Sequence, residues 1–567
     1  MFKRGGDSQS GPQFVALVGC GPAGMMLLHA LAHKKKTLDP SSKEYKNLPT
    51  ITCYEQASSP GGVWRKYSKG AEPGDDIVMY DDMWCNTPKE MMEFNDYTFD
   101  DHFKSPTPSF LSRKDVLDYL LARNSADGAL DDVKFKHSVQ MVKYQSNKFV
   151  VTVVDGTSGK TKNETFDRCI WAAGVQATPE KPSELLEMLQ EYTGKVIHSS
   201  EARETFEDDV KGKRVMIIGD SSSAEDLALR AVKLGVEKVY ICARSGEGAA
   251  YSTGCWPNKK VTALFGLPYK VVKETGFKVQ AVYWSEKRQR YRRDDDEETV
   301  KVKDIDMVIL ATGYGCNLNM IDDSLKFDPD CEWQAPKGWI MDNNALTISL
   351  GNVDHSSNLD IGATCYPDVY RYLLISNPNM IYLTETEDTE TPLIDLDVAA
   401  WLVLSYLTGQ TDVPKEKEMI KANQKQLEAE MQIPFLRLAM DSVYADELDE
   451  LGDDHWSENP NDERSLILGK QAAIFKAERL ARDMKTSGYP VDFGKPSKLS
   501  STGENFVNLL VASEAIRASM TKESGDSKWR TYRDADPNVF KSLYTETASV
   551  QLPARWLDID PAHSFKK

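Results

Sequence analysis

The sequence predicts an α/β fold made of two parallel-sheet units, each of which opens with a strand, a glycine-containing turn and a helix. The two turns begin at Gly19 and Gly219, about two hundred residues apart, and each lies between an apolar strand and a helix. Two further apolar runs, 166–174 and 305–313, end in a glycine and are typical of buried parallel strands. We expect each of these runs to close one of the two units.

The first turn follows the apolar strand 14–18 and runs into a helix from Met25 onward. Gly19 makes the tight turn, Gly21 lets the backbone approach a pyrophosphate, and Gly24 lets the helix pack closely on the strand. The start of the helix offers free N–H groups to phosphates. A glycine-rich turn can also be purely structural, but this position between strand and helix favours a dinucleotide-binding site.

An acidic residue is expected where the second strand of such a unit ends, because it holds the ribose hydroxyls. Glu55 takes this place, although it lies further along than the usual ~20 residues because the polar insertion 34–47 precedes the strand. Gly61 and Gly62 follow, then Trp64. A glycine pair alone is an ordinary turn, but this order after a dinucleotide turn favours a backbone that presses against a flat cofactor.

The second turn carries Ser221 where the first has its second glycine. A small side chain still permits close approach, and the hydroxyls of Ser221, Ser222 and Ser223 can donate to phosphate oxygens. Arg244 ends the next strand, where an NAD site would carry an acid; arginine there accommodates a 2′-phosphate and favours NADPH. The alternative is a solvated strand end. One dinucleotide needs one turn, so two turns predict a flavin and a nicotinamide.

Further motifs lie between and after these turns: the segment 79–99 with Trp84 and Asn86, the segment 192–200 with Gly194 and His198, and Ala311-Thr-Gly313-Tyr314. Together with Glu55 and the Gly-Gly-x-Trp sequence, they resemble the class B flavin-dependent monooxygenases. Within that class the chain is similar to the flavin-containing monooxygenases, and among these to the soluble bacterial trimethylamine monooxygenases. The resemblance is continuous from residue 14 to about 410 and patchy beyond.

The resemblance implies two Rossmann-like domains, with the NADPH domain inserted in the FAD domain. It places the FAD domain at 14–205 and 310–415, the NADPH domain at 206–309, and a mainly helical C-terminal region at 416–567. In the resembled subgroup the C-terminal region contributes to a homodimer and lends a residue to the nicotinamide site; Arg533 is the candidate here. Independently of the resemblance, 415–431 and 464–480 have the spacing of amphipathic helices.

The implied activity is an NADPH- and O2-dependent oxygenation of a small soft nucleophile, a trimethylamine-like amine or a thioether, to an N- or S-oxide through a C4a-hydroperoxyflavin. The cofactor carries the difficult chemistry, so no strong acid or base and no metal is needed. Asn86 is the expected catalytic residue, donating an amide N–H at the flavin edge, and Trp84 would line the same pocket. His198 would couple the two domains. The expected cofactor-binding residues are Gly19, Gly21, Pro22, Ala23, Gly24, Glu55, Gln56, Gly62, Val63, Trp64, Trp84, Asn86, Val139, Ser221, Ser222, Ser223, Glu225, Asp226, Arg244 and Arg533.

The chain departs from the family pattern at several positions. Tyr192 stands in place of a phenylalanine, and Ala202 in place of an aromatic residue. Ser222 stands where the trimethylamine enzymes carry a tyrosine that gates the substrate, and the acidic stretch 384–390 replaces a polar and aromatic run. Baeyer–Villiger oxygenation of a ketone, an uncoupled NADPH oxidase and a non-enzymatic dinucleotide sensor are the alternatives.

Composition limits the partners. The formal charge of −18 over 567 residues argues against nucleic acid and against an anionic membrane surface. We see no run near the ~20 apolar residues of a membrane span and no secretory signal, so we expect a cytoplasmic protein. The nine cysteines are expected to be reduced, and none forms Cys-x-x-Cys, which argues against a disulfide reductase.

Overall fold

The structure is a computed structural model of the chain. It describes residues 13–66, 79, 83, 85, 89–94, 96–104, 111–174, 178–203, 205–219, 222–243, 260–285, 290–293, 298–315, 318–327, 368–383, 392–430, 480 and 482–490.

A six-stranded sheet forms the first lobe, with the strand order β19-β20-β21-β6-β1-β2. Its strands are β1 (Phe14–Val18), β2 (Thr50–Tyr54), β6 (Arg168–Trp171), β19 (Val369–Tyr370), β20 (Leu373–Leu374) and β21 (Met380–Tyr382). The pairs from β21 to β2 are parallel, whereas β19, β20 and β21 pair antiparallel. The strand β6, expected from the run 166–174, therefore lies inside this sheet, between β21 and β1.

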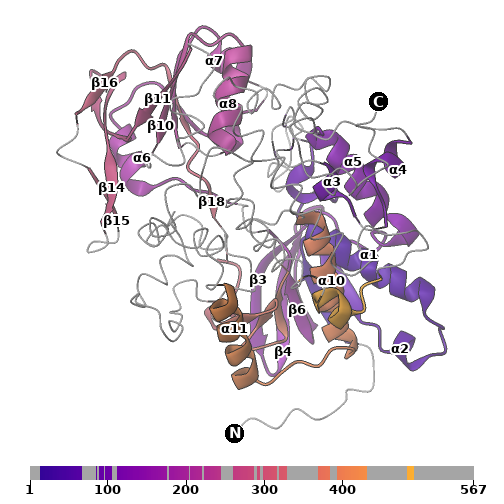
Figure 1. The fold of residues 1–567 in the computed structure, drawn as a ribbon. Helices are drawn as coiled ribbons and strands as arrows, with labels where there is room; N and C mark the ends of the chain where they lie inside the picture. Colours follow the sequence, from indigo (N-terminus) through magenta and orange to yellow (C-terminus); the bar gives the residue numbers. More distant parts are fainter. Residues whose placement is uncertain are drawn as a thin grey trace.

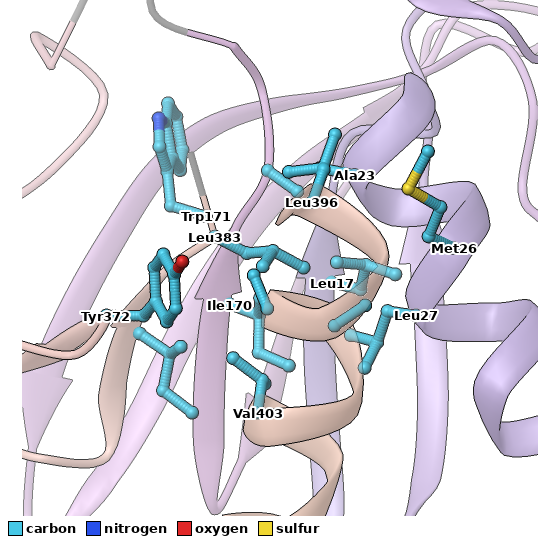
Figure 2. Packing of buried hydrophobic residues seen from close by; sticks show 14 of the residues in the cluster. Leu17, Ala23, Met26, Leu27, Ile170, Trp171, Tyr372, Leu383, Leu396 and Val403 are labelled. Atoms are coloured by element: carbon cyan, nitrogen blue, oxygen red, sulfur yellow. The ribbon is translucent and has the colours of Figure 1, made fainter. Parts of the chain in front are cut away.

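Both faces of this sheet are covered. On one face lie α1 (Pro22–Thr37) and α10 (Pro392–Thr408), and Figure 2 shows Leu27 of α1 and Val403 of α10 packed around Ile170 of β6. The other face meets an antiparallel meander of β3 (His137–Gln145), β4 (Lys148–Asp155) and β5 (Thr161–Phe166). The rings of Tyr54 and Phe166 form a T-shaped contact there, with centroids 6.2 Å apart.

A five-stranded parallel sheet forms the second lobe, in the order β11-β10-β9-β17-β8. Its strands are β8 (Lys195–His198), β9 (Arg214–Ile218), β10 (Lys238–Ala243), β11 (Val261–Phe265) and β17 (Met307–Leu310). The helix α8 (Ser222–Lys233) packs on one face, and α6 (Ser183–Leu189) with a small sheet packs on the other. The second sheet thus begins at β8, upstream of residue 206.

Three smaller sheets complete the described strands. They are the three-stranded sheet of β12 (Leu267–Val272), β13 (Gly276–Gln280) and β16 (Val300–Val302), the hairpin of β14 (Val282–Ser285) and β15 (Arg290–Arg293), and the pair of β7 (Thr178–Pro179) and β18 (Tyr314–Gly315). The last pair runs antiparallel where the chain passes from the first lobe to the second and back, and Figure 1 shows β18 between the lobes.

The remaining described helices are shorter or lie near the C-terminal side. They are α2 (Lys43–Lys46), α3 (Lys89–Met92), α4 (Phe99–Phe103), α5 (Arg113–Asn124), α7 (Phe206–Val210) and α11 (Glu416–Glu430), with 3-10 turns η1 (Gly62–Trp64), η2 (Ala126–Gly128), η3 (Ser199–Glu201) and η6 (Asp323–Leu325). The helix expected at 415–431 is present as α11, whereas most of the one expected at 464–480 lies outside the described residues. None of the described helices is both long and apolar enough to cross a bilayer.

Candidate functional site

The first glycine turn lies at the carboxyl end of β1. Gly19 adopts a φ of +103°, and a Cβ on it would lie 2.4 Å from the carbonyl oxygen of Ala172. A Cβ on Gly24 would lie 2.2 Å from the carbonyl oxygen of Gly19. Neither site has room for a side chain, so both glycines are required by the turn itself.

Gly21 plays a different part, because it is the N-cap of α1 with an ordinary φ of −75°. No side chain caps this end of the helix, no acidic residue stands in its first turn, and Pro22 occupies the start. The N–H groups of Ala23 and Gly24 therefore lie in a helix start that has no side-chain acceptor, with the positive end of the helix dipole behind them. This is an anion-binding end of the kind that holds a pyrophosphate.

The glycine pair predicted to press on a cofactor lies against the first turn. A Cβ on Gly62 would lie 3.0 Å from the Cα of Gly21, and the N–H of Gly61 donates to the carbonyl of Cys20 at 3.0 Å. Gly62, Val63 and Trp64 form η1, and the half-buried Trp64 packs against the core of the first lobe. The two glycine segments form one narrow cradle of bare backbone.

Glu55 stands at the edge of the same cradle. Its buried carboxylate accepts the N–H of Cys20 at 2.7 Å through Oε2 and the N–H of Ala57 at 2.9 Å through Oε1. A carboxylate has about four lone-pair sites, so acceptor capacity remains for ribose hydroxyls. Gln56 beside it is exposed, and Val139 is buried in β3 opposite Val153 of β4.

The second lobe repeats the geometry of the first turn. Gly219 has a φ of +112°, and a Cβ on it would lie 2.1 Å from the carbonyl oxygen of Ala311. Its N–H donates to the carbonyl of Cys242 at 2.9 Å, as that of Gly19 donates to Tyr54 at 2.8 Å. The first turn is thus held between the ends of β2 and β6, and the second between the ends of β10 and β17. Ser223 and Asp226 lie half-buried in the first turns of α8, which starts at Ser222.

His198 ends β8 and is fully buried. Its Nδ1 accepts the N–H of Ser200 at 3.2 Å, so Nε2 carries the proton and donates to the carbonyl of Gly313 at 3.1 Å. Burial, which desolvates the ring, lowers the pKa of His198 below its usual value. A neutral histidine that ties η3 to the segment before β18 suits a structural role more than proton transfer; that His198 couples the two domains stays a prediction.

Tyr192 stands where the family carries a phenylalanine, and its additional hydroxyl is hydrogen-bonded. Its ring lies against Gly194, where a Cβ would be 2.1 Å from the hydroxyl oxygen, and that hydroxyl donates to the carbonyl of Ile305 at 3.1 Å. Ala202, in place of an aromatic residue, is buried in the core under α8, and its carbonyl accepts from Arg230 at 2.8 Å. Both departures fit the packing around them.

Several predicted site residues fall in parts of the chain that the structure does not describe. Trp84, Asn86, Ser221, Arg244, Arg533 and the acidic stretch 384–390 lie outside the described residues, and the side chains of Ser222 and Glu225 are not among those described. Of the segment around Asn86, Met83 and Cys85 are described, and they pair with the chain just before α5.

Sequence reasoning missed one residue at the cradle. Arg113 begins α5 and is buried, and its guanidinium donates to the carbonyl of Trp64. The only sequence signal is that Arg113 stands at the start of a helix, and this does not distinguish a site residue from any other residue at a helix start. Within the described ranges, no group of three or more His, Cys, Asp or Glu side chains could hold a metal ion.

The cradle fits the pyrophosphate of a flavin dinucleotide. Bare backbone at Gly21 and Gly62, an uncapped helix start and a carboxylate at the next strand end are the three features such a group needs. Glu55 suits a ribose hydroxyl, which donates, and the helix start suits a phosphate, which accepts.

Comparison with known proteins agrees with this geometry. Residues 15–279 match the family model described as flavin-binding monooxygenase-like. The chain is 32% identical over 356 residues to the trimethylamine monooxygenase of Pelagibacter sp. strain HTCC7211, covering 61% of this chain and 72% of that protein. It is 27% identical over 456 residues to the one from Pelagibacter ubique strain HTCC1002, covering 77% and 85%.

Solved structures show the same fold. The crystal structure of Tmm from Pelagibacter sp. strain HTCC7211 superposes with a TM-score of 0.59 at 25% identity, covering 84% of this chain and 87% of that one. S-allyl-L-cysteine S-oxygenase from Allium sativum gives 0.56 at 19% identity, covering 95% and 99%, and so supports the fold alone. The matched motifs, the cradle and these relatives lead to one conclusion: the chain belongs to the flavin-containing monooxygenase family and is an FAD-dependent monooxygenase.

Proposed function

We propose that the protein uses NADPH and O2 to oxygenate a small soft nucleophile, an amine or a thioether, to its N- or S-oxide. The observation that carries this proposal is the repeated turn geometry, with Gly19 closed by Ala172 and Gly219 closed by Ala311. Two such turns on one chain suit a flavin and a nicotinamide together, and the bacterial relatives are named trimethylamine monooxygenases.

FAD would be held by the first lobe. The start of α1 at Gly21, Pro22, Ala23 and Gly24 would take the pyrophosphate, and Glu55 the ribose hydroxyls. Gln56, Gly62, Val63, Trp64 and Val139 are the further proposed contacts. Bound FAD supplies the redox chemistry: reduced by NADPH, it activates O2 for transfer of one oxygen atom. The protein then needs to position the partners and to exclude water.

The nicotinamide would be held by the second lobe. Ser222, Ser223, Glu225 and Asp226 belong to the first turns of α8, where phosphates are favoured, and Ser221 directly precedes the helix in the sequence. Arg244 would bind the 2′-phosphate, Trp84 would line the pocket, and Arg533 would reach it from the C-terminal region. Asn86 would donate its amide N–H at the flavin edge.

The two sheets support an FAD domain interrupted by an NADPH domain, as proposed from the sequence. The bounds 206 and 309 stay a prediction; the pairing of β8 with β17 supports boundaries of the NADPH domain further out, near β7 and β18. A mainly helical C-terminal region, a homodimer and a cytoplasmic location remain predictions.

The substrate class rests on the relatives, and Ser222 is the reason not to narrow it to trimethylamine. A tyrosine gate is missing at that position, so a bulkier amine or thioether is compatible with the chain. Baeyer–Villiger oxygenation of a ketone is the second candidate, because it needs the same two cofactors.

The test is turnover under 18O2 with NADPH and, in turn, trimethylamine, a thioether and a ketone. The proposal expects one 18O atom in the N-oxide or S-oxide, with product and NADPH consumption in proportion. Label in an ester would identify Baeyer–Villiger chemistry. Hydrogen peroxide equal to the NADPH consumed with every substrate would identify an oxidase, and no NADPH consumption would identify a binding protein.

Replacing Asn86 with Ala tests the residue roles within the same assay. The oxygenated product should fall on the order of 100-fold, the typical effect of removing one preorganised donor, while NADPH oxidation continues. Product formation at the parental rate would remove Asn86 from the site.

A further inference from the structure

Arg113 joins the glycine cradle to the segment that leads to Asn86. The side chain is 3% exposed, and its Nη1 donates to the carbonyl of Trp64 at the end of η1. The backbone N–H of the same residue donates to the carbonyl of Met83 at 2.9 Å. One residue thus fixes two segments that are distant from it in the sequence.

The pairing on the side of Met83 is a two-point contact. Besides the bond from Arg113, the N–H of Cys85 donates to the carbonyl of Leu111 at 2.9 Å. Residues 83–85 and 111–113 therefore exchange two backbone hydrogen bonds and cannot slide past each other without breaking both. Cys85 directly precedes Asn86 in the sequence, so the contact holds the chain at the residue before the proposed catalytic amide.

The helix α5 gives Arg113 a rigid base. Its start is capped by Ser112, whose hydroxyl accepts the N–H of Asp115 at 3.2 Å. Leu117, one turn further on, lies under the cradle: a Cβ on Gly61 would be 2.7 Å from its Cδ1. The far end of α5 is anchored by Arg123, whose guanidinium contacts Asp397 at 3.1 and 2.7 Å.

The residue type is informative. A cation in the first turn of a helix opposes the helix dipole, and burial of a guanidinium costs solvation, so local helix formation does not favour an arginine here. A guanidinium does suit a buried carbonyl, because its donors are fixed in a plane and it is less strongly hydrated than an ammonium. The contact with Trp64 therefore favours an arginine at this position, whereas the helix does not.

We propose that Arg113 is a positioning residue for the monooxygenase reaction, holding the flavin cradle and the chain at Met83 and Cys85, just before Asn86 in the sequence, in one fixed geometry. This inference rests on the proposed function. In the coupled reaction NADPH, H+, O2 and substrate give NADP+, water and the oxygenated product. When the geometry is loosened, the same electrons reduce O2 to hydrogen peroxide, so NADPH, H+ and O2 give NADP+ and H2O2. Arg113 sets the share of electrons that follows the first route.

The test compares Arg113→Lys and Arg113→Gln with Lys114→Gln, a change at the adjacent position, whose side chain is 74% exposed. Hydrogen peroxide per NADPH is measured with saturating FAD and substrate, together with FAD content and the visible circular dichroism of the bound flavin. We expect the peroxide fraction to rise roughly five-fold in both Arg113 variants, the effect of one lost hydrogen bond. The flavin dichroism should change with it, while Lys114→Gln stays at the parental values.

An unchanged peroxide fraction per bound flavin would overturn the proposal, even if the variants lose FAD or melt earlier, because a merely structural residue gives that result. Lysine keeps the positive charge and glutamine removes it, so the two replacements disturb folding in different ways. If only one of the two variants folds, its peroxide fraction decides the question. If the parent protein makes no oxygenated product, the proposed function fails on its own. The flavin dichroism then decides the role of Arg113, since altered spectra in its variants alone support positioning and parental spectra refute it.

Discussion

The guanidinium of Arg123 and the carboxylate of Asp397 form a two-point ion pair inside the first lobe, with Nη1–Oδ1 and Nη2–Oδ2 distances of 3.1 and 2.7 Å. The side chains are 3% and 0% exposed. Asp96 accepts from Nε of Arg123 at 2.9 Å, and the hydroxyl of Tyr489 donates to Asp397 at 2.8 Å. The pair therefore ties α5 to α10 and to the described segment at 482–490.

Replacing Asp397 with Asn should destabilise the first lobe by about 3–5 kcal/mol, because it leaves the Arg123 cation buried without its full counter-charge. Urea unfolding followed by far-UV circular dichroism measures this. The control is Glu207→Gln: Glu207 and Lys211 form an ion pair whose side chains are 56% and 66% exposed, so the loss should be within about 0.5 kcal/mol. Equal, small shifts in both variants would contradict the assignment.

Two glycines of one turn should respond differently to the same substitution. Gly19→Ala should lower stability strongly, since its Cβ would lie 2.4 Å from the Ala172 carbonyl and φ is +103°. Gly21→Ala meets nothing closer than 3.6 Å, in Gly62, so the FAD-free protein should keep most of its stability. Its FAD affinity should fall roughly ten-fold or more because the pyrophosphate loses its close approach. Thermal unfolding without FAD and FAD titration separate the two effects; parental FAD affinity in Gly21→Ala would count against the cradle.

Arg244→Gln should weaken the preference for NADPH over NADH. A charge-assisted hydrogen bond to the 2′-phosphate contributes about 1.5–3 kcal/mol, so KM for NADPH should rise roughly ten- to hundred-fold. KM for NADH, which has no 2′-phosphate, should hardly change and serves as the internal control. If both constants move together, Arg244 acts on the fold and not on the phosphate.

His29 should give the protein an acid-sensitive stability. Burial in α1, and then the Arg123 cation, lower the pKa of His29 to about 3. Above pH 6.5 the ring is neutral in both states and contributes no pH dependence. Below that value the unfolded chain binds a proton that the folded chain refuses, so stability falls as pH falls, by up to about 1.4 kcal/mol per pH unit, until the folded pKa is reached.

The variant His29→Gln removes the imidazole that binds this proton in the unfolded chain. Denaturant midpoints measured from pH 7 to pH 4 should therefore fall less steeply in the variant than in the parent protein. If the midpoints of the variant and the parent protein fall equally steeply, other titrating groups cause the loss of stability at low pH.

Much of the site's backbone could be predicted from the sequence, because it depends on short-range rules. Gly19 and Gly219 stand where a strand must turn into a helix, β17 is a continuous apolar run, and β6 is apolar after its first residue, Arg168. Glycine spacing and the length of an apolar run are local properties, so they can be recognised in the sequence before the fold is known.

The polar contacts that hold the site could not be predicted in the same way. Arg123 and Asp397 are 274 positions apart, and the hydroxyl of Tyr192 meets the carbonyl of Ile305 after 113 positions. Which charged residue is buried depends on which helices meet, and no periodicity encodes that. The sheet to which β8 belongs was equally hidden, because its partner β17 comes more than a hundred positions later.

The pairing of β21 with β6 has a consequence for synthesis on the ribosome. About two hundred residues separate these neighbours, whereas the strands of the second sheet lie in one uninterrupted stretch of chain. At roughly 5–20 residues per second, β21 leaves the ribosome some 10–40 s after β6. The sheet of the second lobe can therefore be complete while the sheet of the first lobe still has an open edge along β6. Nascent chains should need protection from strand-to-strand association during that interval.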